Sequence, residues 1–270
     1  MLSVERFLRR SINTRIMSAS KLRLDELLVS RGLAASRAQA KALIMTGRVR
    51  RGTERLDKPG KEFPDDTELS IDQPPRFVSR GGEKLEKALD AFGIAVDSRS
   101  VVDVGSSTGG FTDCVLQRGA SRVFAVDVGR NQLHERIASD PRVTWREGIN
   151  VRDMSASDMP FPCSLLVADL SFISLTVVMP ALGELVGPEQ GFGEQVMVLL
   201  VKPQFEVGRQ EASKGRGVIT DARLHRESVD KVVDAATRLG WEFRGSVESP
   251  IKGQDGNTEF LLHLTRAARA

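Results

Sequence analysis

A glycine-rich turn after a short apolar run is the part of this sequence best suited to bind a small ligand. The run contains Asp103, and the turn that follows carries Gly105, Gly109 and Gly110. At the carboxyl end of a strand, such a turn presents backbone N–H groups to a nucleotide-like ligand. The dinucleotide pattern G-x-G-x-x-G would require a glycine at Ser107, so the sequence disfavours a pyrophosphate and favours a smaller adenosyl group.

A second acidic residue ends the next apolar run along the chain. Asp127 follows Val123–Val126, where its carboxylate can bind the two hydroxyls of a ribose. The glycine turn and the acids at two successive strand ends together predict S-adenosylmethionine as the ligand. The alternative is a strand-to-helix turn that binds nothing, although burying a strand-end carboxylate such as Asp103 is costly unless something pairs with it.

Four further charged residues could carry out chemistry beside this ligand. Asp169 ends one apolar run, and Lys202 ends the run 196–201. The carboxyl ends of strands in an open parallel sheet face one crevice, so both residues should lie beside the glycine turn. Lys84, before the glycine-rich strand, and Glu259, at the start of the last strand, complete the set. The alternatives are a helix-surface ion pair for Lys84 and a strand-edge charge for Glu259.

The rest of the C-terminal part supplies the elements that would position these residues. Apolar runs alternate with helical patterns, which predicts an α/β fold with a mostly parallel, doubly wound sheet. The expected strands lie near 100–105, 122–128, 143–147, 164–170, 195–202, 241–248 and 258–264, and the expected helices near 110–118, 131–139, 173–186 and 221–239. The last two strands should form a hairpin that adds an antiparallel edge strand.

The N-terminal part differs in pattern and in charge. Residues 1–80 hold 17 Lys and Arg against 10 Asp and Glu, a net charge of +7, and the rest of the chain carries −4. Helical patterns at 22–29 and 36–44 are each followed by a glycine, and strands are expected at 48–53 and 67–71. A basic module beside a mildly acidic one predicts that the first module meets a polyanion.

The N-terminal motifs resemble the S4 RNA-binding domain. The sequence contains R-L-D-E-L-L and R-G-L-A-A-S-R, then a glycine before a basic strand, and the resemblance covers about residues 21–72. It implies a small α+β domain whose basic face binds RNA phosphates and RNA shape rather than base identity. The residues that match this face are Arg23, Arg31, Ser36, Arg37, Lys41 and Arg48. Arg50, Arg51 and Arg55 are expected to be ordinary solvated charges.

The C-terminal part resembles the FtsJ-like ribose 2′-O-methyltransferases, because the order Lys84, Asp169, Lys202, Glu259 is similar to their K-D-K-E tetrad. With the S4 pattern in front, the chain from about residue 17 resembles the TlyA family, whose members are named both hemolysins and ribosomal RNA 2′-O-methyltransferases. The resemblance is carried by 79–84, 103–111, 168–174, 201–206 and 214–218. It implies a class I, Rossmann-like methyltransferase domain that acts on ribosomal RNA of the small subunit, the large subunit or both.

The resemblance also implies a role for each residue. Lys202 would polarise or deprotonate the 2′-hydroxyl of a ribose, that of cytidine in this family. Asp169 and Glu259 would orient the ammonium group, and Lys84 would add a second positive charge. The methyl group of S-adenosylmethionine would then transfer in line, without a metal. The residues expected to bind S-adenosylmethionine are Asp103, Gly105, Ser107, Thr108, Gly109, Gly110, Phe111, Asp127 and Asn150.

The expected domain boundaries are 1–20 for a disordered leader, 21–73 for the S4-like domain, 74–79 for a linker and 80–270 for the methyltransferase domain. Met17 stands just before the first patterned segment, so translation could start at Met1 or Met17. The longest apolar run, 196–201, is far shorter than the about 20 residues that span a bilayer. The two cysteines give no disulfide framework, so we expect a cytoplasmic protein with no membrane or metal partner.

Two other functions are alternatives to catalysis. A hemolysin-type, membrane-active protein would need an exposed amphipathic segment able to enter lipid, and the sequence shows neither such a segment nor an export signal. A non-catalytic S4-type RNA-binding factor could retain an inactive methyltransferase fold. Other methyl acceptors fit less well, because no proline follows Asp169, as amine methylation would require, and Cys114 and Cys163 are poorly placed for carbon methylation.

Overall fold

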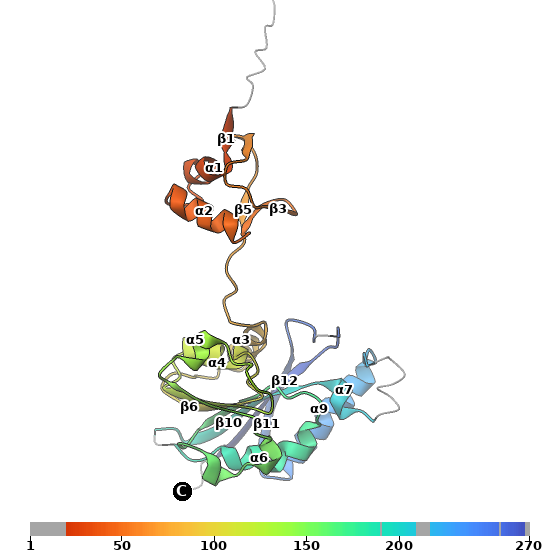
Figure 1. Ribbon diagram of the computed structural model, residues 1–270. Coiled ribbons are helices and arrows are strands. Elements are labelled where there is room, and N and C mark those ends of the chain that lie inside the picture. Colours follow the sequence, from red (N-terminus) through yellow and green to blue (C-terminus); the bar gives the residue numbers. More distant parts are fainter. Residues whose placement is uncertain (1–19, 190, 209–216, 254, 268–270) are drawn as a thin grey trace, which may run out of the picture. The chain divides into compact units, whose positions relative to one another are not determined.

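The computed structural model describes residues 20–189, 191–208, 217–253 and 255–267. The chain divides into two compact units between Pro74 and Pro75. The expected leader and most of the segment 214–218 lie outside the described residues. Figure 1 shows the elements of both units, and each unit has a hydrophobic core of its own.

The N-terminal unit combines two short helices with two small antiparallel sheets, one of order β1-β4 and one of order β3-β2-β5. Its elements are β1 (Lys21–Arg23), α1 (Leu24–Ser30), α2 (Arg37–Met45), β2 (Val49–Arg51), β3 (Glu54–Leu56), β4 (Glu62–Pro64) and β5 (Ser70–Ile71). Its core contains Leu24 and Leu28 from α1 and Ile44 from α2. The small α+β architecture expected from the S4 resemblance is confirmed.

Two N-terminal elements differ from the expected ranges. The first helix begins at Leu24, not Leu22, because Lys21–Arg23 pair with β4 as a strand. The strand expected over 67–71 covers only Ser70–Ile71. The second helix begins as predicted: Ser36 is its N-cap, and the Ser36 hydroxyl accepts a hydrogen bond from the backbone N–H of Gln39 at 3.2 Å.

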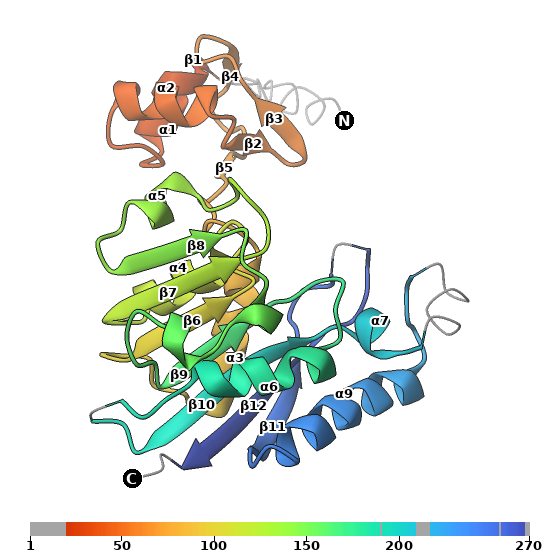
Figure 2. The same cartoon turned by 60° about the horizontal axis from the view of Figure 1, so that its bottom comes forward.

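The C-terminal unit is built on a seven-stranded sheet of order β11-β12-β10-β9-β6-β7-β8 (Figure 2). The strands are β6 (Ser100–Val104), β7 (Arg122–Asp127), β8 (Val143–Glu147), β9 (Leu165–Ala168), β10 (Glu194–Val201), β11 (Glu242–Glu248) and β12 (Phe260–Ala267). β6 to β10 are parallel to one another, whereas β12 is antiparallel to both β10 and β11. The antiparallel strand expected at the edge therefore lies inside the sheet, and β11 forms the edge.

Helices cover both faces of this sheet, as a doubly wound fold requires. They are α3 (Gly81–Phe92), α4 (Gly110–Gln117), α5 (Glu135–Ala138), α6 (Leu175–Leu185), α7 (Pro203–Glu206) and α9 (Ala222–Thr237), with 3-10 turns η1 (Val151–Asp153) and η2 (Ala156–Asp158). Val101 of β6 packs in the cluster with α3 and α4, and its neighbour Val102 packs in the cluster with α6 and α9. Burial on both faces explains why β6, β7, β9 and β10 are largely apolar runs, whereas β8 is exposed for most of its length and mostly polar.

The predicted fold class is confirmed: a Rossmann-like α/β unit follows a small α+β unit along the chain. One helix is shorter than expected: α5 covers Glu135–Ala138 rather than 131–139, because Asn131 takes a left-handed backbone with φ of +57°. None of the helices within the described residues combines the length and the apolar character needed to cross a membrane.

Candidate active site

The glycine turn between β6 and α4 is fixed by close backbone packing. Gly105 has a φ of +82°, and a Cβ atom there would lie 2.5 Å from the carbonyl oxygen of Asp169 at the end of β9. At the end of β7, the Asp127 carboxylate accepts the backbone N–H of Ser107 at 2.8 Å and that of Gly129 at 2.6 Å. The first glycine therefore lets two strand ends meet, and the acid holds the turn from the other side.

Two clefts lie beside this turn. The larger cleft, of about 690 Å³, and the smaller cleft, of about 420 Å³, are both within the size range of small-molecule sites. They share the lining residues Gly105, Ser107, Asp169, Ser171 and Phe172. A ligand that fills the smaller cleft would thus contact five residues that also line the larger cleft.

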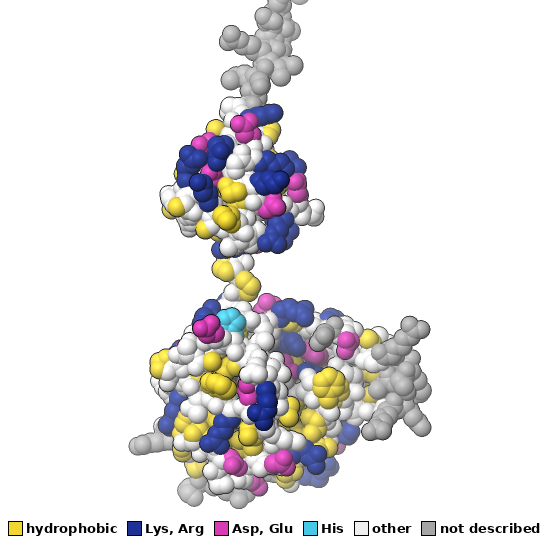
Figure 3. Space-filling view, viewed as in Figure 1, with side chains coloured by type: hydrophobic (Ala, Val, Ile, Leu, Met, Phe, Trp, Pro, Cys, Tyr) yellow, Lys and Arg dark blue, Asp and Glu magenta, His cyan; other side chains and the backbone are white. Residues whose placement is uncertain are grey.

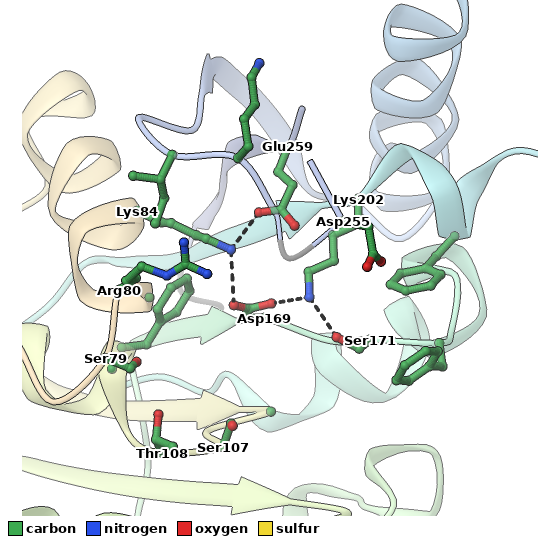
Figure 4. Close-up of a pocket in the computed structure, with 18 of the residues that line it drawn as sticks. Ser79, Arg80, Lys84, Ser107, Thr108, Asp169, Ser171, Lys202, Asp255 and Glu259 are labelled. Atoms are coloured by element: carbon green, nitrogen blue, oxygen red, sulfur yellow. Dashed lines mark hydrogen bonds and ion pairs between the residues drawn. The ribbon is translucent and has the colours of Figure 1, made fainter. Parts of the chain in front are cut away.

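The four charged residues predicted from the sequence come together in the larger cleft (Figure 4). Lys84 Nζ lies 2.6 Å from Glu259 Oε2 and 3.9 Å from Asp169 Oδ2. Lys202 Nζ lies 2.6 Å from Asp169 Oδ1 and donates a hydrogen bond to Ser171 Oγ at 2.8 Å. Asp169 therefore stands between two ammonium groups that come from opposite sides of the cleft.

This cluster is largely shielded from water. Lys84 and Lys202 are each 9% exposed, and Glu259 is 2% exposed. Asp169 Oδ1 is buried and has no hydrogen bond of good geometry, so its contact with Lys202 is a close ion pair. Buried charges of this kind are tolerated when they are paired, and their mutual interactions are stronger than in water.

The residues predicted to bind S-adenosylmethionine are not all exposed to a cleft. Gly105 and Ser107 line both clefts; Thr108, Gly110 and Phe111 line the larger one; Asp127 and Asn150 line the smaller one. Asp103 and Gly109 line neither. Asp103 is completely buried beneath the turn, where Thr112 donates a hydrogen bond to its Oδ2 and burial raises the pKa of its carboxyl group to about 7.

Ser171, Phe172 and Phe205 are among the cleft residues that have no individual role in the sequence-based prediction. Ser171 holds Lys202. Phe172 is 92% exposed with a φ of +65°, and its ring lies 5.4 Å from that of Phe205. All three lie in segments that carry the family resemblance, 168–174 and 201–206. The family resemblance therefore marked these two segments, but the sequence does not show which of their side chains reach the cleft.

Glu206 links the two loops that bear Asp169 and Lys202. It is 3% exposed and accepts hydrogen bonds from the backbone N–H of Leu175 at 2.7 Å and from the hydroxyl of Ser174, at the start of α6. Burial raises the pKa of its carboxyl group. Glu206 thus joins the β9–α6 loop to the end of β10, an interaction the sequence did not reveal.

The residues predicted to bind RNA lie in the N-terminal unit, whose charged surface in Figure 3 is dominated by Lys and Arg. Arg23 and Arg37 both pair with the buried Asp25. The hydrogen bond from Arg23, and to a lesser extent that from Arg37, lowers the pKa of the Asp25 carboxyl group. Arg48 donates to the carbonyl oxygen of Asp72 at 2.7 Å.

The remaining three predicted RNA-binding residues differ in their surroundings. Arg31 donates to the carbonyl oxygen of Asp65, and Ser36 caps α2. Lys41 is exposed on α2 and has no ion pair with any described residue. Three of the six side chains are thus held by contacts to backbone groups, and Arg23 and Arg37 are held by Asp25.

The two cysteines are not suited to nucleophilic catalysis. Cys114 and Cys163 are both buried in the core, and burial raises the pKa of each thiol to about 12. A thiol with such a pKa remains protonated near neutral pH and is a poor nucleophile. Their burial agrees with the expectation that both are poorly placed for carbon methylation.

A model of the FtsJ-like methyltransferase family matches residues 77–266, and a model of the S4 domain matches residues 22–68. The chain belongs to the FtsJ-like methyltransferase family. It is 45% identical over 255 residues to the 16S/23S rRNA (cytidine-2′-O)-methyltransferase TlyA of Mycobacterium tuberculosis, covering 93% of each chain. It is 37% identical to Hemolysin A of Brachyspira hyodysenteriae, covering 90% of this chain and 99% of that relative. The resemblance to the TlyA family is confirmed.

Solved structures agree with this assignment. A hemolysin-named protein from Streptococcus thermophilus is 41% identical, with a TM-score of 0.68, and covers 93% of this chain and 90% of its own. A Listeria monocytogenes structure named as an S-adenosylmethionine-dependent methyltransferase has a TM-score of 0.50 at 15% identity, covering 70% of this chain and 99% of its own. This second likeness concerns the fold alone.

Proposed function

We propose that the protein transfers a methyl group from S-adenosylmethionine to the 2′-hydroxyl of a cytidine ribose in ribosomal RNA. The observation that carries the proposal is the cluster of Lys84, Asp169, Lys202 and Glu259 beside the glycine turn. The relative from M. tuberculosis bears the name of this activity at 45% identity over nearly the whole chain. The S4 unit adds a surface suited to RNA.

The smaller cleft fits an adenosyl group. Its walls include the apolar side chains Val128, Ile149 and Val151, which suit a base, and Asp127 at the ribose end. Each Asp127 oxygen accepts one backbone N–H and retains a lone pair for a hydroxyl donor. When bound, S-adenosylmethionine supplies a methyl group on a positively charged sulfur.

The larger cleft would receive the ribose. A 2′-hydroxyl is a weak nucleophile near neutral pH, so the protein must stabilise the negative charge that develops on its oxygen. Lys202 supplies an ammonium group for this purpose, held by Asp169 and Ser171. The hydroxyl proton passes to the Asp169–Lys202 pair, and Lys84, fixed by Glu259, keeps Asp169 oriented.

The experiment is a methyl-transfer assay with purified protein, labelled S-adenosylmethionine and ribosomal subunits from a strain that lacks the gene. Mass spectrometry of the ribosomal RNA locates the modified ribose. Lys202→Ala should lower kcat by about a thousandfold or more while S-adenosylmethionine still binds, because the charge on the oxygen is no longer stabilised. Lys87→Ala is the matched control, since Lys87 is an exposed lysine of α3 outside both clefts.

Three results would contradict the proposal. Ribosomal RNA with identical 2′-O-methylation in the deletion strain would remove the substrate assignment. Full activity in Lys202→Ala would remove the catalytic assignment, and retained RNA binding with no methyl transfer by the wild-type protein would favour a non-catalytic RNA-binding factor.

A further inference from the structure

Arg80 stands out among the charged residues of the larger cleft. In Figure 4 its guanidinium group extends from the start of α3 into the pocket alongside Lys84. Among the described residues, neither an ion pair nor a side-chain hydrogen bond involves Arg80. Its side chain is exposed, so the guanidinium donors face the cleft and solvent.

The other basic residues of the larger cleft are already engaged. Lys84 and Lys202 pair with Glu259 and Asp169 as described. Lys252 contacts Glu248 at 3.1 Å and donates to the hydroxyl of Thr258 at 2.8 Å. The described lining holds four basic side chains, and of these only Arg80 lacks an acidic partner among the described residues. An anionic ligand group would supply that partner.

The backbone beneath Arg80 is held in place by close packing. A Cβ atom at Gly82 would lie 2.2 Å from the ring of Phe77, and one at Gly110 would lie 2.2 Å from Ser79 Oγ. Gly82 therefore leaves room for the Phe77 ring, and Gly110 lets the start of α4 approach the start of α3. Arg80 thus projects from a rigid corner of the cleft, which favours a specific contact over a mobile surface charge.

The position of Arg80 relative to Lys84 indicates which anion it meets. Residues four apart in a helix lie on the same face, with Cβ atoms about 5–6 Å apart. In RNA, the 2′-oxygen and the 3′-phosphodiester are attached to neighbouring carbons of the ribose. A ribose with its 2′-oxygen beside Lys84 and Lys202 therefore places its 3′-phosphate within reach of a group one helical turn away.

We propose that Arg80 binds the phosphodiester on the 3′ side of the methylated ribose and so orients the 2′-oxygen toward Lys202. The proposal rests on the proposed function, because it takes the larger cleft as the ribose site. Arg80 lines the larger cleft and not the smaller one, which argues against the carboxylate of the methyl donor as its ligand. A guanidinium group suits a phosphate because it can donate two parallel hydrogen bonds.

The test compares Arg80→Gln and Arg80→Lys with Lys87→Gln, which removes one positive charge from the same helix outside both clefts. Arg80→Gln should raise KM for ribosomal subunits about tenfold or more. It should also reduce the slope of log RNA affinity against log salt concentration by the amount that roughly one phosphate contact contributes. Arg80→Lys should restore part of the affinity, and Lys87→Gln should change neither quantity. Affinity for S-adenosylmethionine should stay unchanged in all three variants, which also shows that they are folded.

A direct probe compares cytidine 3′-monophosphate with cytidine 5′-monophosphate as inhibitors. The 3′-phosphate should improve inhibition of the wild type and give no advantage in Arg80→Gln. Equal behaviour of Arg80→Gln and Lys87→Gln would overturn the proposal, as would a weakened affinity for S-adenosylmethionine or a fall in kcat at constant KM. If the wild type methylates no ribosomal RNA, the proposed function fails, and direct RNA binding at several salt concentrations still decides the role of Arg80.

Discussion

At the scale of single residues, two acids with similar places in the sequence have different surroundings. Asp127 lies at the rim of the smaller cleft and accepts two backbone N–H groups. Asp103 is enclosed by protein and bonds to Thr112, with one oxygen left without a partner among the described residues. We therefore expect Asp127 to bind the methyl donor and Asp103 to act on stability.

Asp103→Asn should change how stability depends on pH. Burial raises the folded pKa of Asp103 from 3.8 to about 7, so in that range the folded protein holds the proton more tightly than the unfolded chain. The contribution of this group to the free energy of unfolding therefore falls as pH rises from about 4 to about 7 and is constant above. Urea unfolding across this range should show a flatter dependence in Asp103→Asn than in the wild type.

The comparison variant is Asp127→Asn. It should lower the affinity for S-adenosylmethionine about tenfold or more, because a carboxylate accepts hydrogen bonds from hydroxyl groups more strongly than an amide does. Asp103→Asn should leave that affinity nearly unchanged. An unaltered pH dependence in Asp103→Asn would mean that the buried carboxyl titrates in its ordinary range.

Asp127, Asp169 and Lys202 could be predicted because each ends an apolar run long enough to mark a buried strand. The partners of these residues could not. Ser171 meets Lys202 across 31 residues of sequence, and Glu206 meets Leu175 across the same distance. Such contacts depend on how the two segments that follow β9 and β10 fold over the carboxyl ends of these strands. No periodic pattern in the sequence encodes them.

At the scale of elements, the central parallel strands were predictable, whereas three short strands of the N-terminal unit, β1, β3 and β4, were not. β6 and β10 are buried on both faces and therefore appear as apolar runs. β3 and β4 have three residues each, with one buried side chain apiece, and they form because they pair with β2 and β1. Tertiary pairing, not local propensity, creates these two strands.

Gly105→Ala should damage both the fold and donor binding. The left-handed backbone at φ +82° costs about 1–2 kcal/mol for a residue with a Cβ, and the new atom would lie 2.5 Å from the carbonyl oxygen of Asp169. We expect a loss of more than about 2 kcal/mol in unfolding free energy and a large loss of S-adenosylmethionine affinity. Denaturant unfolding and calorimetric titration measure the two effects.

Gly240→Ala is the matched control for this prediction. Its φ is +81°, and a Cβ atom there would have no neighbour within 4 Å. It should lose only the cost of the backbone conformation, about 1–2 kcal/mol, and keep its ligand affinity. Similar losses in both variants would show that the close approach of β6 and β9 is not what demands the glycine.

At the scale of the whole molecule, the S4 unit and the methyltransferase unit have separate cores. The N-terminal core is built from residues of its own unit, and the two C-terminal clusters flank one sheet. The part before residue 81 carries a charge of +7 and the rest carries −4. The sequence-based prediction that the first module meets a polyanion rests on this division.

A fragment of residues 75–270 should fold and bind S-adenosylmethionine with the affinity of the full chain. Its two core clusters contain only residues of the C-terminal unit, so removing the N-terminal unit takes nothing from them. Its KM for ribosomal subunits should rise about tenfold or more, since most of the basic surface is gone. Circular dichroism, calorimetric titration and the methyl-transfer assay test these points. An unchanged KM would place RNA recognition in the C-terminal unit alone.

The covalent bond between Pro74 and Pro75 has a kinetic consequence. Once one unit is bound to its RNA, the other meets the same molecule at a local concentration in the millimolar range, far above that of free ribosomes. The catalytic pocket can therefore hold its nucleotide weakly and still be filled at every encounter. Weak retention allows the modified nucleotide to leave quickly, so tight capture of the particle and fast turnover need not compete.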